Sequence, residues 1–183
     1  METMKPIFKV HELSFEEMID EAAIQARVQE LGAEIRAIYK DKNPLFIGIL
    51  NGAFLFAADL IRACDVPCEI DFIRMSSYKG LKSTGEVKIT LESKIEIKDR
   101  HIIIVEDIVD TGNTLHAFQQ DLKKLEPASV AIATLLSKPE AIQHDLKVEF
   151  VGFEIPPKFV IGYGLDYNEQ GRHLRSIYKL IDE

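Results

Sequence analysis

Short apolar runs alternate with amphipathic stretches along most of the chain. Residues 45–50 (LFIGIL) and 102–105 (IIIV) are continuously apolar and of strand length, and a turn and a helical pattern follow each of them. Further strand patterns fall at residues 68–75, 130–136, 148–153 and 159–163. Strands that alternate with amphipathic helices predict an α/β fold, with a mainly parallel twisted sheet flanked by helices on both faces.

Two other segments complete this outline. Ser14 and Glu17 form the S-x-x-E pattern of a capping box, and apolar residues then recur at helical spacing, so the first predicted element is a long amphipathic helix. Residues 76–86 (SSYKGLKSTGE) contain two glycines and few apolar side chains. That composition predicts a mobile loop.

Composition narrows the class of protein. The length of 183 residues favours one domain spanning residues 1–183. A formal net charge of -8 argues against general nucleic-acid binding, which relies on clustered Lys and Arg. No apolar run approaches the roughly 20 residues of a membrane span, and residues 1–10 do not resemble a signal peptide. Cys64 and Cys68 fit reduced structural residues, so we expect a cytoplasmic protein without membrane contact.

Candidate chemistry is concentrated in residues 102–115 (IIIVEDIVDTGNTL). Glu106, Asp107 and Asp110 follow a buried strand, and a Thr-Gly turn then opens a helix whose first N–H groups and dipole suit a phosphate. Carboxylates repel phosphate, so these acids should face sugar hydroxyls or a divalent cation carried by a second phosphate group. A phosphorylated, metal-chelated sugar satisfies both requirements. A structural alternative is that Glu106 and Asp107 solvate a strand end while Asp110 caps the helix.

Two motifs resemble a known family. The run VEDIVDTGNTL resembles the phosphoribosyl-diphosphate signature of the type I phosphoribosyltransferases, and residues 151–169 (VGFEIPPKFVIGYGLDYNE) resemble a segment of their hypoxanthine-guanine branch. LLSK at residues 135–138 and MSSY at residues 75–78 extend the resemblance. It implies the type I fold, with a small hood and a mobile loop. It also implies purine salvage by Mg²⁺-dependent transfer of ribose 5-phosphate from phosphoribosyl diphosphate to hypoxanthine or guanine, with release of pyrophosphate.

The resemblance also implies roles for single residues. Asp110 would be catalytic, as the acceptor of a proton from the purine. Phosphoribosyl diphosphate would be bound by Gly52, Ser77, Tyr78, Glu106, Asp107, Thr111, Gly112, Asn113, Thr114 and Arg172. The purine would be bound by Lys138, Phe159, Val160 and Asp166, and magnesium by Glu106, Asp107 and Asp166. A lysine that donates to the exocyclic oxygen favours a 6-oxopurine over adenine.

Several of these residues also have ordinary structural alternatives. Taken alone, Lys138 fits a solvated loop lysine and Phe159 fits a core aromatic residue. Asp166 fits a turn residue, and Arg172 fits a surface charge. The neighbouring motifs favour the functional interpretation in each case.

The turn after residues 45–50 departs from the family. Many relatives have Leu-Lys-Gly there, whereas this chain has Leu50-Asn51-Gly52, so a positive side chain near the pyrophosphate is missing. The family's turn often contains a cis peptide, and Gly52 keeps that geometry feasible. We expect activity to be retained, with pyrophosphate binding resting more on Arg172 and the metal.

Other classes of protein fit the sequence less well. The five histidines show no H-x-x-x-H spacing, and no G-x-x-x-x-G-K-[ST] loop exists, so zinc and P-loop enzymes are disfavoured. Xanthine or another 6-oxopurine is an alternative base. A regulatory module that senses phosphoribosyl diphosphate and binds nucleic acid would need a basic face, which the acidic composition disfavours. The expected partners are therefore small-molecule substrates, and the family implies a homodimer or homotetramer.

Overall fold

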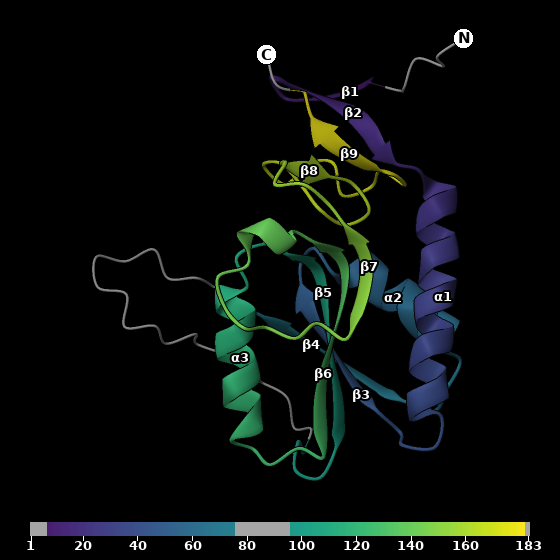
Figure 1. Ribbon diagram of the computed structural model, residues 1–183. Helices are drawn as coiled ribbons and strands as arrows, with labels where there is room; N and C mark the ends of the chain where they lie inside the picture. Colours follow the sequence, from purple (N-terminus) through teal and green to yellow (C-terminus); the bar gives the residue numbers. More distant parts are fainter. Residues whose placement is uncertain (1–6, 76–95, 182–183) are drawn as a thin grey trace.

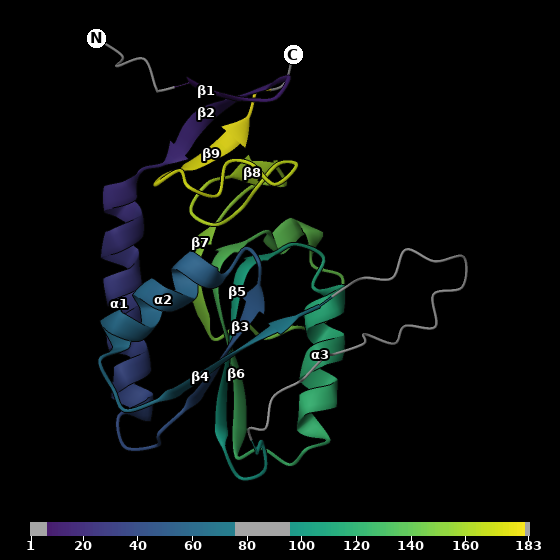
Figure 2. The same ribbon diagram turned by 180° about the vertical axis from the view of Figure 1, so that it is seen from behind.

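The computed structural model describes residues 7–75 and 96–181. Its centre is a five-stranded sheet (Figures 1 and 2) with the strand order β4 (Glu69–Arg74), β3 (Leu45–Leu50), β5 (His101–Val109), β6 (Ser129–Ser137) and β7 (Phe150–Glu154). Every pairing in it is parallel, which confirms the predicted α/β sheet and brings the carboxyl ends of the strands to one edge. The predicted loop at residues 76–86, with Ser77 and Tyr78, lies outside the described residues.

Helices flank the sheet on both faces (Figures 1 and 2). One face carries α1 (Glu21–Tyr39) and α2 (Phe54–Cys64), and the other carries α3 (Asn113–Lys123). A short 3-10 turn, Pro139–Ala141, follows β6. Within the described ranges, no helix has the length and apolar character needed to cross a membrane.

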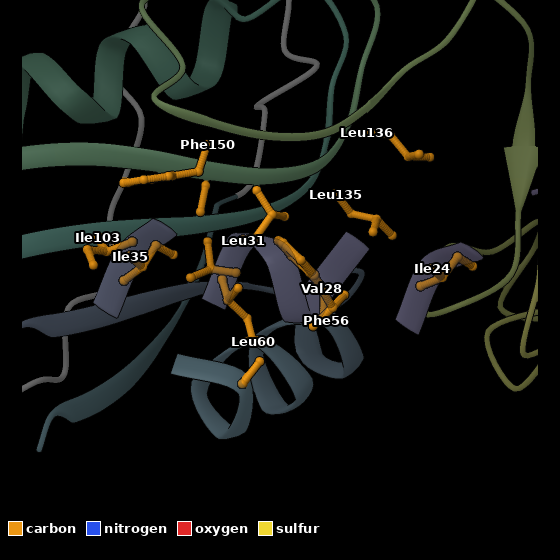
Figure 3. Close-up of a cluster of buried hydrophobic side chains, with 14 of the residues drawn as sticks. Ile24, Val28, Leu31, Ile35, Phe56, Leu60, Ile103, Leu135, Leu136 and Phe150 are labelled. Atoms are coloured by element: carbon orange, nitrogen blue, oxygen red, sulfur yellow. The ribbon is translucent and has the colours of Figure 1, made fainter. Parts of the chain in front are cut away.

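The apolar strands are buried on both of their faces. Alternate residues of a strand point in opposite directions, so Ile103 and Val105 pack with α1 and α2, whereas Ile102 and Ile104 join the cluster under α3. Figure 3 shows the first cluster, which includes Ile24, Val28, Leu31, Ile35, Phe56, Leu60, Ile103, Leu135, Leu136 and Phe150. Burial on two faces explains why these strands read as unbroken apolar runs.

A second, smaller sheet forms the predicted hood beyond one end of the large one (Figure 1). It is antiparallel, with the strand order β1 (Ile7–Val10), β2 (Leu13–Ile19), β9 (Ile177–Leu180) and β8 (Val160–Ile161). Its own core contains Val10, Phe15, Ile161 and Leu174. The predicted strand at residues 159–163 is therefore short and belongs to this hood.

The predicted start of the first helix is wrong. Ser14 lies in β2, and Asp20 caps α1 by accepting a hydrogen bond from the Ala23 N–H at 2.7 Å. Residues 13–19 pair with both β1 and β9, and Phe15 is fully buried between them. Because β9 is more than 150 residues away in the sequence, the local S-x-x-E pattern carried no information about this pairing.

The strand that bears the acidic residues is longer than predicted. Instead of ending at Val105, β5 continues through Glu106 and Asp107 to Val109. Its pairing with β6 also continues, with Glu106 opposite Thr134. Continued pairing holds the first two carboxylates on a rigid strand, so only Asp110 lies in the turn.

Candidate active site

The residues predicted to bind an anion lie where β5 turns into α3. Gly112 occupies the N-cap position with a φ of 76°, a left-handed conformation that glycine adopts without strain. The Gly112 carbonyl accepts the His116 N–H at 2.8 Å, so the N–H groups before it in the first turn have no helical acceptor. These groups adjoin a pocket of about 310 Å³, whose lining includes Gly52, Glu106, Asp107, Asp110, Thr111, Gly112, Asn113 and Thr114.

The turn after β3 forms the opposite wall of this pocket. The Leu50–Asn51 peptide bond is cis, as the family resemblance implies. Gly52 lies directly against the Asp107 carboxylate, where a Cβ atom would overlap the carboxylate oxygen. Gly164, with a φ of 104°, packs against the Gly52 carbonyl, where a Cβ atom would also overlap its neighbour. Glycine at both positions lets three separate segments converge on this wall.

A second pocket of about 170 Å³ adjoins the first. Its lining gathers all four predicted purine residues and the predicted proton acceptor, and consists of Asp107, Ile108, Asp110, Lys138, Phe159, Val160, Leu165 and Asp166. The two pockets share Asp107, Ile108 and Asp110. A ligand that spans both would therefore pass over Asp110.

Asp110 and Lys138 form an ion pair in the smaller pocket. Lys138 Nζ lies 2.9 Å from Asp110 Oδ2, and the side chains are 11% and 53% exposed, respectively. Lys138 is therefore a buried residue that follows β6, which rules out the solvated loop lysine. An ammonium group has three donors, so Lys138 can hold Asp110 and still donate to a ligand oxygen.

Phe159 lies on the surface of the smaller pocket. Its side chain is 45% exposed, which rules out a fully buried core residue. The Tyr167 ring contacts it edge to face at a centroid distance of 5.9 Å, and the Phe15 ring lies 6.3 Å away. These two rings hold Phe159 in place while part of its ring remains accessible to a planar ligand.

The carboxylates of the larger pocket could hold a metal together with a ligand. Burial, and secondly the neighbouring Asp107 carboxylate, raise the pKa of Glu106 well above its ordinary value. Within residues 7–75 and 96–181, no three or more His, Cys, Asp or Glu side chains are arranged to hold a metal ion. Glu106, Asp107 and Asp166 therefore do not form one preformed site. Mg²⁺ commonly uses one or two carboxylates plus phosphate oxygens, and the pair Glu106 and Asp107 fits that pattern.

Asp166 and Arg172 are brought together, but of the two only Asp166 belongs to the lining of these two pockets. Arg172 Nη2 lies 2.9 Å from Asp166 Oδ1, and Nη1 donates to the Gly164 carbonyl at 2.9 Å. A further contact, of 3.3 Å, joins Arg172 to Glu169. The guanidinium thus crosslinks the loop after β8, and its charge is partly neutralised by carboxylates.

The sequence did not predict two polar contacts at the edge of the site. Tyr163 donates a short hydrogen bond to Asp59 on α2, and Arg74 donates to the Asn51 side chain at 3.1 Å. The first pair is 104 residues apart and left no local signal. The second pair follows from the register of β3 and β4, which places Leu50 opposite Arg74.

Comparison with known proteins gives a consistent family. The profile of the phosphoribosyl transferase domain matches residues 15–168. The hypoxanthine phosphoribosyltransferase of Salmonella typhimurium is 47% identical over 91% of this chain and 95% of its own length. The hypoxanthine-guanine phosphoribosyltransferase of Bacillus subtilis is 46% identical over 87% of this chain and 89% of its own. Among solved structures, a hypoxanthine phosphoribosyltransferase from Staphylococcus aureus superposes with a TM-score of 0.86 at 40% identity, covering 91% of each chain.

Proposed function

The chain belongs to the phosphoribosyl transferase domain family, and from this premise we propose how it acts. It is an enzyme of purine salvage that transfers the 5-phosphoribosyl group from phosphoribosyl diphosphate to hypoxanthine or guanine. In the reaction, the bond between the sugar carbon and pyrophosphate breaks. A bond to a purine nitrogen forms, and the purine loses a proton.

One observation carries the proposal. The pocket with the helix N-terminus and the pocket with Lys138 and Phe159 share the Asp110 side chain. A phosphorylated sugar in the first pocket and a purine in the second would meet beside this carboxylate. A group that accepts a proton and stabilises developing positive charge is needed at that meeting point.

The larger pocket binds the phosphorylated sugar in this proposal. The turn into α3 and the start of the helix, at residues 111–114, offer backbone N–H groups and threonine hydroxyls to the 5-phosphate. Glu106 and Asp107 hold the ribose hydroxyls, and Gly52 offers its backbone to pyrophosphate. By family resemblance alone, Ser77 and Tyr78 also bind this substrate.

We assign Mg²⁺ to the same pocket, held by Glu106, Asp107 and oxygens of the substrate. When bound, the ion supplies positive charge that neutralises the departing pyrophosphate. The raised pKa of Glu106 makes its charged form costly in the free protein, and a cation beside it would favour ionisation. Asp166 adjoins the purine pocket, where the family resemblance assigns it a second metal contact.

The smaller pocket binds the base. Asp110 accepts the proton that the purine loses, and Lys138 donates to the purine's exocyclic oxygen. The stem of Lys138 is buried, so its ammonium group has a fixed position between Asp110 and the ligand. Phe159 stacks on the ring, and Val160 offers backbone groups to its edge. Adenine presents an amino group where Lys138 needs an acceptor, so the pocket favours 6-oxopurines.

Three further proposals concern Arg172, assembly and location. Arg172 binds the pyrophosphate of the substrate through its positive charge. To do so, it releases one of its carboxylate partners, Asp166 or Glu169. A homodimer or homotetramer follows from the family resemblance and is tested by analytical ultracentrifugation. A cytoplasmic location is supported by Cys64 and Cys68, both of which are free thiols.

The decisive assay measures nucleotide formation from phosphoribosyl diphosphate with hypoxanthine, guanine, xanthine and adenine in parallel. We expect turnover of hypoxanthine or guanine, none of adenine, and loss of activity when EDTA removes magnesium. Preference for xanthine would change the assigned base. A folded protein that binds phosphoribosyl diphosphate and converts no base would contradict the proposed activity.

A further inference from the structure

The larger pocket has an unfavourable charge for its proposed ligand. Among the described residues that line it are three carboxylates, those of Glu106, Asp107 and Asp110, and no lysine, arginine or histidine. Phosphoribosyl diphosphate carries a 5-phosphate and a diphosphate. Helix N–H groups serve the first of these, but the diphosphate needs a source of positive charge besides the metal.

Arg74 lies at the wall where that charge is needed. It is the last residue of β4, and its Nη2 donates to Asn51 Oδ1 at 3.1 Å. Asn51 lines the pocket, as does Met75, which follows Arg74. The Arg74 side chain therefore adjoins the rim of the pocket from the neighbouring strand.

Among the described residues, no carboxylate neutralises the charge of Arg74, whereas the charge of Arg172 is partly neutralised. Among the described residues, no carboxylate lies within ion-pair distance of Arg74, and its recorded partner is a neutral amide. Arg172 contacts the carboxylates of Asp166 and Glu169. An arginine fork has five N–H donors, so Arg74 can keep its contact with Asn51 while other donors bind an oxyanion.

We propose that Arg74 binds the pyrophosphate part of phosphoribosyl diphosphate, with Asn51 orienting its guanidinium. The inference rests on the proposed function and adds a ligand-binding residue from β4 to it. It also accounts for Asn51 at the position where many relatives carry lysine. The cation comes from the adjacent strand, and a neutral side chain at position 51 holds it without repulsion.

The test compares two ligands of the intact protein by calorimetry in the presence of magnesium. Pyrophosphate would contact Arg74. IMP, the nucleotide that the proposed reaction forms from hypoxanthine, carries a 5-phosphate and a base but no pyrophosphate. For Arg74→Gln we expect the dissociation constant of pyrophosphate to rise about tenfold or more, as for loss of a charged hydrogen bond. The dissociation constant of IMP should stay within twofold. In kinetics, the KM for phosphoribosyl diphosphate should rise while the KM for hypoxanthine does not.

Three variants serve as controls. Arg100→Gln makes the same change of charge at the amino edge of the sheet, where Arg100 pairs with Glu69 at 2.9 Å, and should leave both ligands unaffected. Arg74→Lys should retain most of the affinity for pyrophosphate. Asn51→Lys, added to Arg74→Gln, should restore pyrophosphate binding by returning a cation to the turn.

The possible results separate the inference from the proposed function. Unchanged pyrophosphate binding in folded Arg74→Gln would overturn the inference, and so would an equal loss of IMP binding. Selective loss with rescue by Asn51→Lys would establish it. If the unaltered protein converted no base, the proposed activity would fail, yet the pyrophosphate measurement would still decide whether Arg74 binds that ligand.

Discussion

The larger pocket takes most of its lining from one unbroken stretch, residues 106–115, and the rest from residues 49–52 and 75, whereas the smaller pocket gathers its lining from four separate stretches. Those stretches are residues 107–110, 138, 159–160 and 165–166. One strand, one turn and one helix fix most of the first pocket. The second depends on how the hood meets the large sheet. Substitutions far from the smaller pocket should therefore disturb it, while the larger pocket should respond mainly to changes within its own segment.

Asp110 belongs to both pockets, so changing it should have the largest effect. Asp110→Asn keeps the shape of the side chain and removes the proposed proton acceptor. We expect kcat to fall about 10²- to 10⁴-fold, because general base catalysis contributes that much, while both KM values change only a few-fold. Steady-state kinetics with each substrate varied in turn measures this.

The matched control for Asp110 is Asp121→Asn, which alters an exposed carboxylate paired with Lys124 at the end of α3. Its kinetic constants should equal those of the unaltered protein. An unchanged kcat in Asp110→Asn would remove Asp110 from the role of proton acceptor. The shared side chain would then only shape the two pockets.

Lys138 tests the smaller pocket by itself. Lys138→Met keeps much of the aliphatic stem and removes the ammonium group that pairs with Asp110. The kcat/KM for hypoxanthine should fall about 10- to 100-fold, as expected for a lost hydrogen bond to a charged group. The ratio of kcat/KM for hypoxanthine to that for adenine should fall, and the KM for phosphoribosyl diphosphate should not change.

Lys124→Met is the control for Lys138, because Lys124 is exposed on the far end of α3. A fall in activity with an unchanged ratio of hypoxanthine to adenine would contradict Lys138 as the donor to the purine oxygen. Lys138 would then act only by orienting Asp110. The selectivity ratio, not the overall rate, is thus the informative quantity.

The same contrast explains what the sequence could predict. The segment at residues 102–115 is local, so its apolar run, acidic residues and Thr-Gly turn predicted the strand and the helix that the structure shows, and they indicate a candidate anion site between them. The proposed purine-binding residues lie in one pocket, but only the family resemblance had connected them. Pairing of Ser14's strand with β9 and contact of Tyr163 with Asp59 join distant segments, and no local pattern encodes such partners. Sequence reasoning therefore placed a helix start inside β2.

A change at Glu106 tests whether the buried negative charge in the larger pocket lowers the stability of the folded protein. Burial and Asp107 raise the Glu106 pKa above its ordinary value of 4.5, so the unfolded chain releases this proton at lower pH than the folded protein does. Between those two pKa values, stability is lost as pH rises, by up to about 1.4 kcal/mol per pH unit. Metal-free Glu106→Gln should therefore be more stable than the unaltered protein at pH 8 and similar at pH 4.

Chemical denaturation of both proteins across this pH range measures the difference. Glu140→Gln, an exposed change in the turn after β6, controls for loss of a surface charge. Parallel stability curves for Glu106→Gln and the unaltered protein would mean that Glu106 titrates alike in both states. Increased stability together with a higher KM for phosphoribosyl diphosphate would show a site residue kept at the expense of stability.

Tyr163 tests the dependence of the smaller pocket on remote contacts. Its hydroxyl donates to Asp59 on α2, and the next residue, Gly164, packs against the carbonyl of Gly52. Tyr163→Phe removes only the hydroxyl, and Asp59 keeps Arg62 as a partner. We expect a loss of about 1 kcal/mol in the free energy of unfolding and a KM for hypoxanthine raised a few-fold, because Asp166 and Leu165 follow on the same loop.

Tyr178→Phe in β9 is the matched control, since Tyr178 packs its ring in the hood and its hydroxyl has no recorded hydrogen bond among the described residues. It should change neither stability nor KM. If Tyr163→Phe lowered stability and left the KM for hypoxanthine unchanged, the contact with α2 would hold the hood without positioning the base. The smaller pocket would then depend as little on remote contacts as the larger one does. The two pockets would differ only in how far apart their lining residues lie in the sequence.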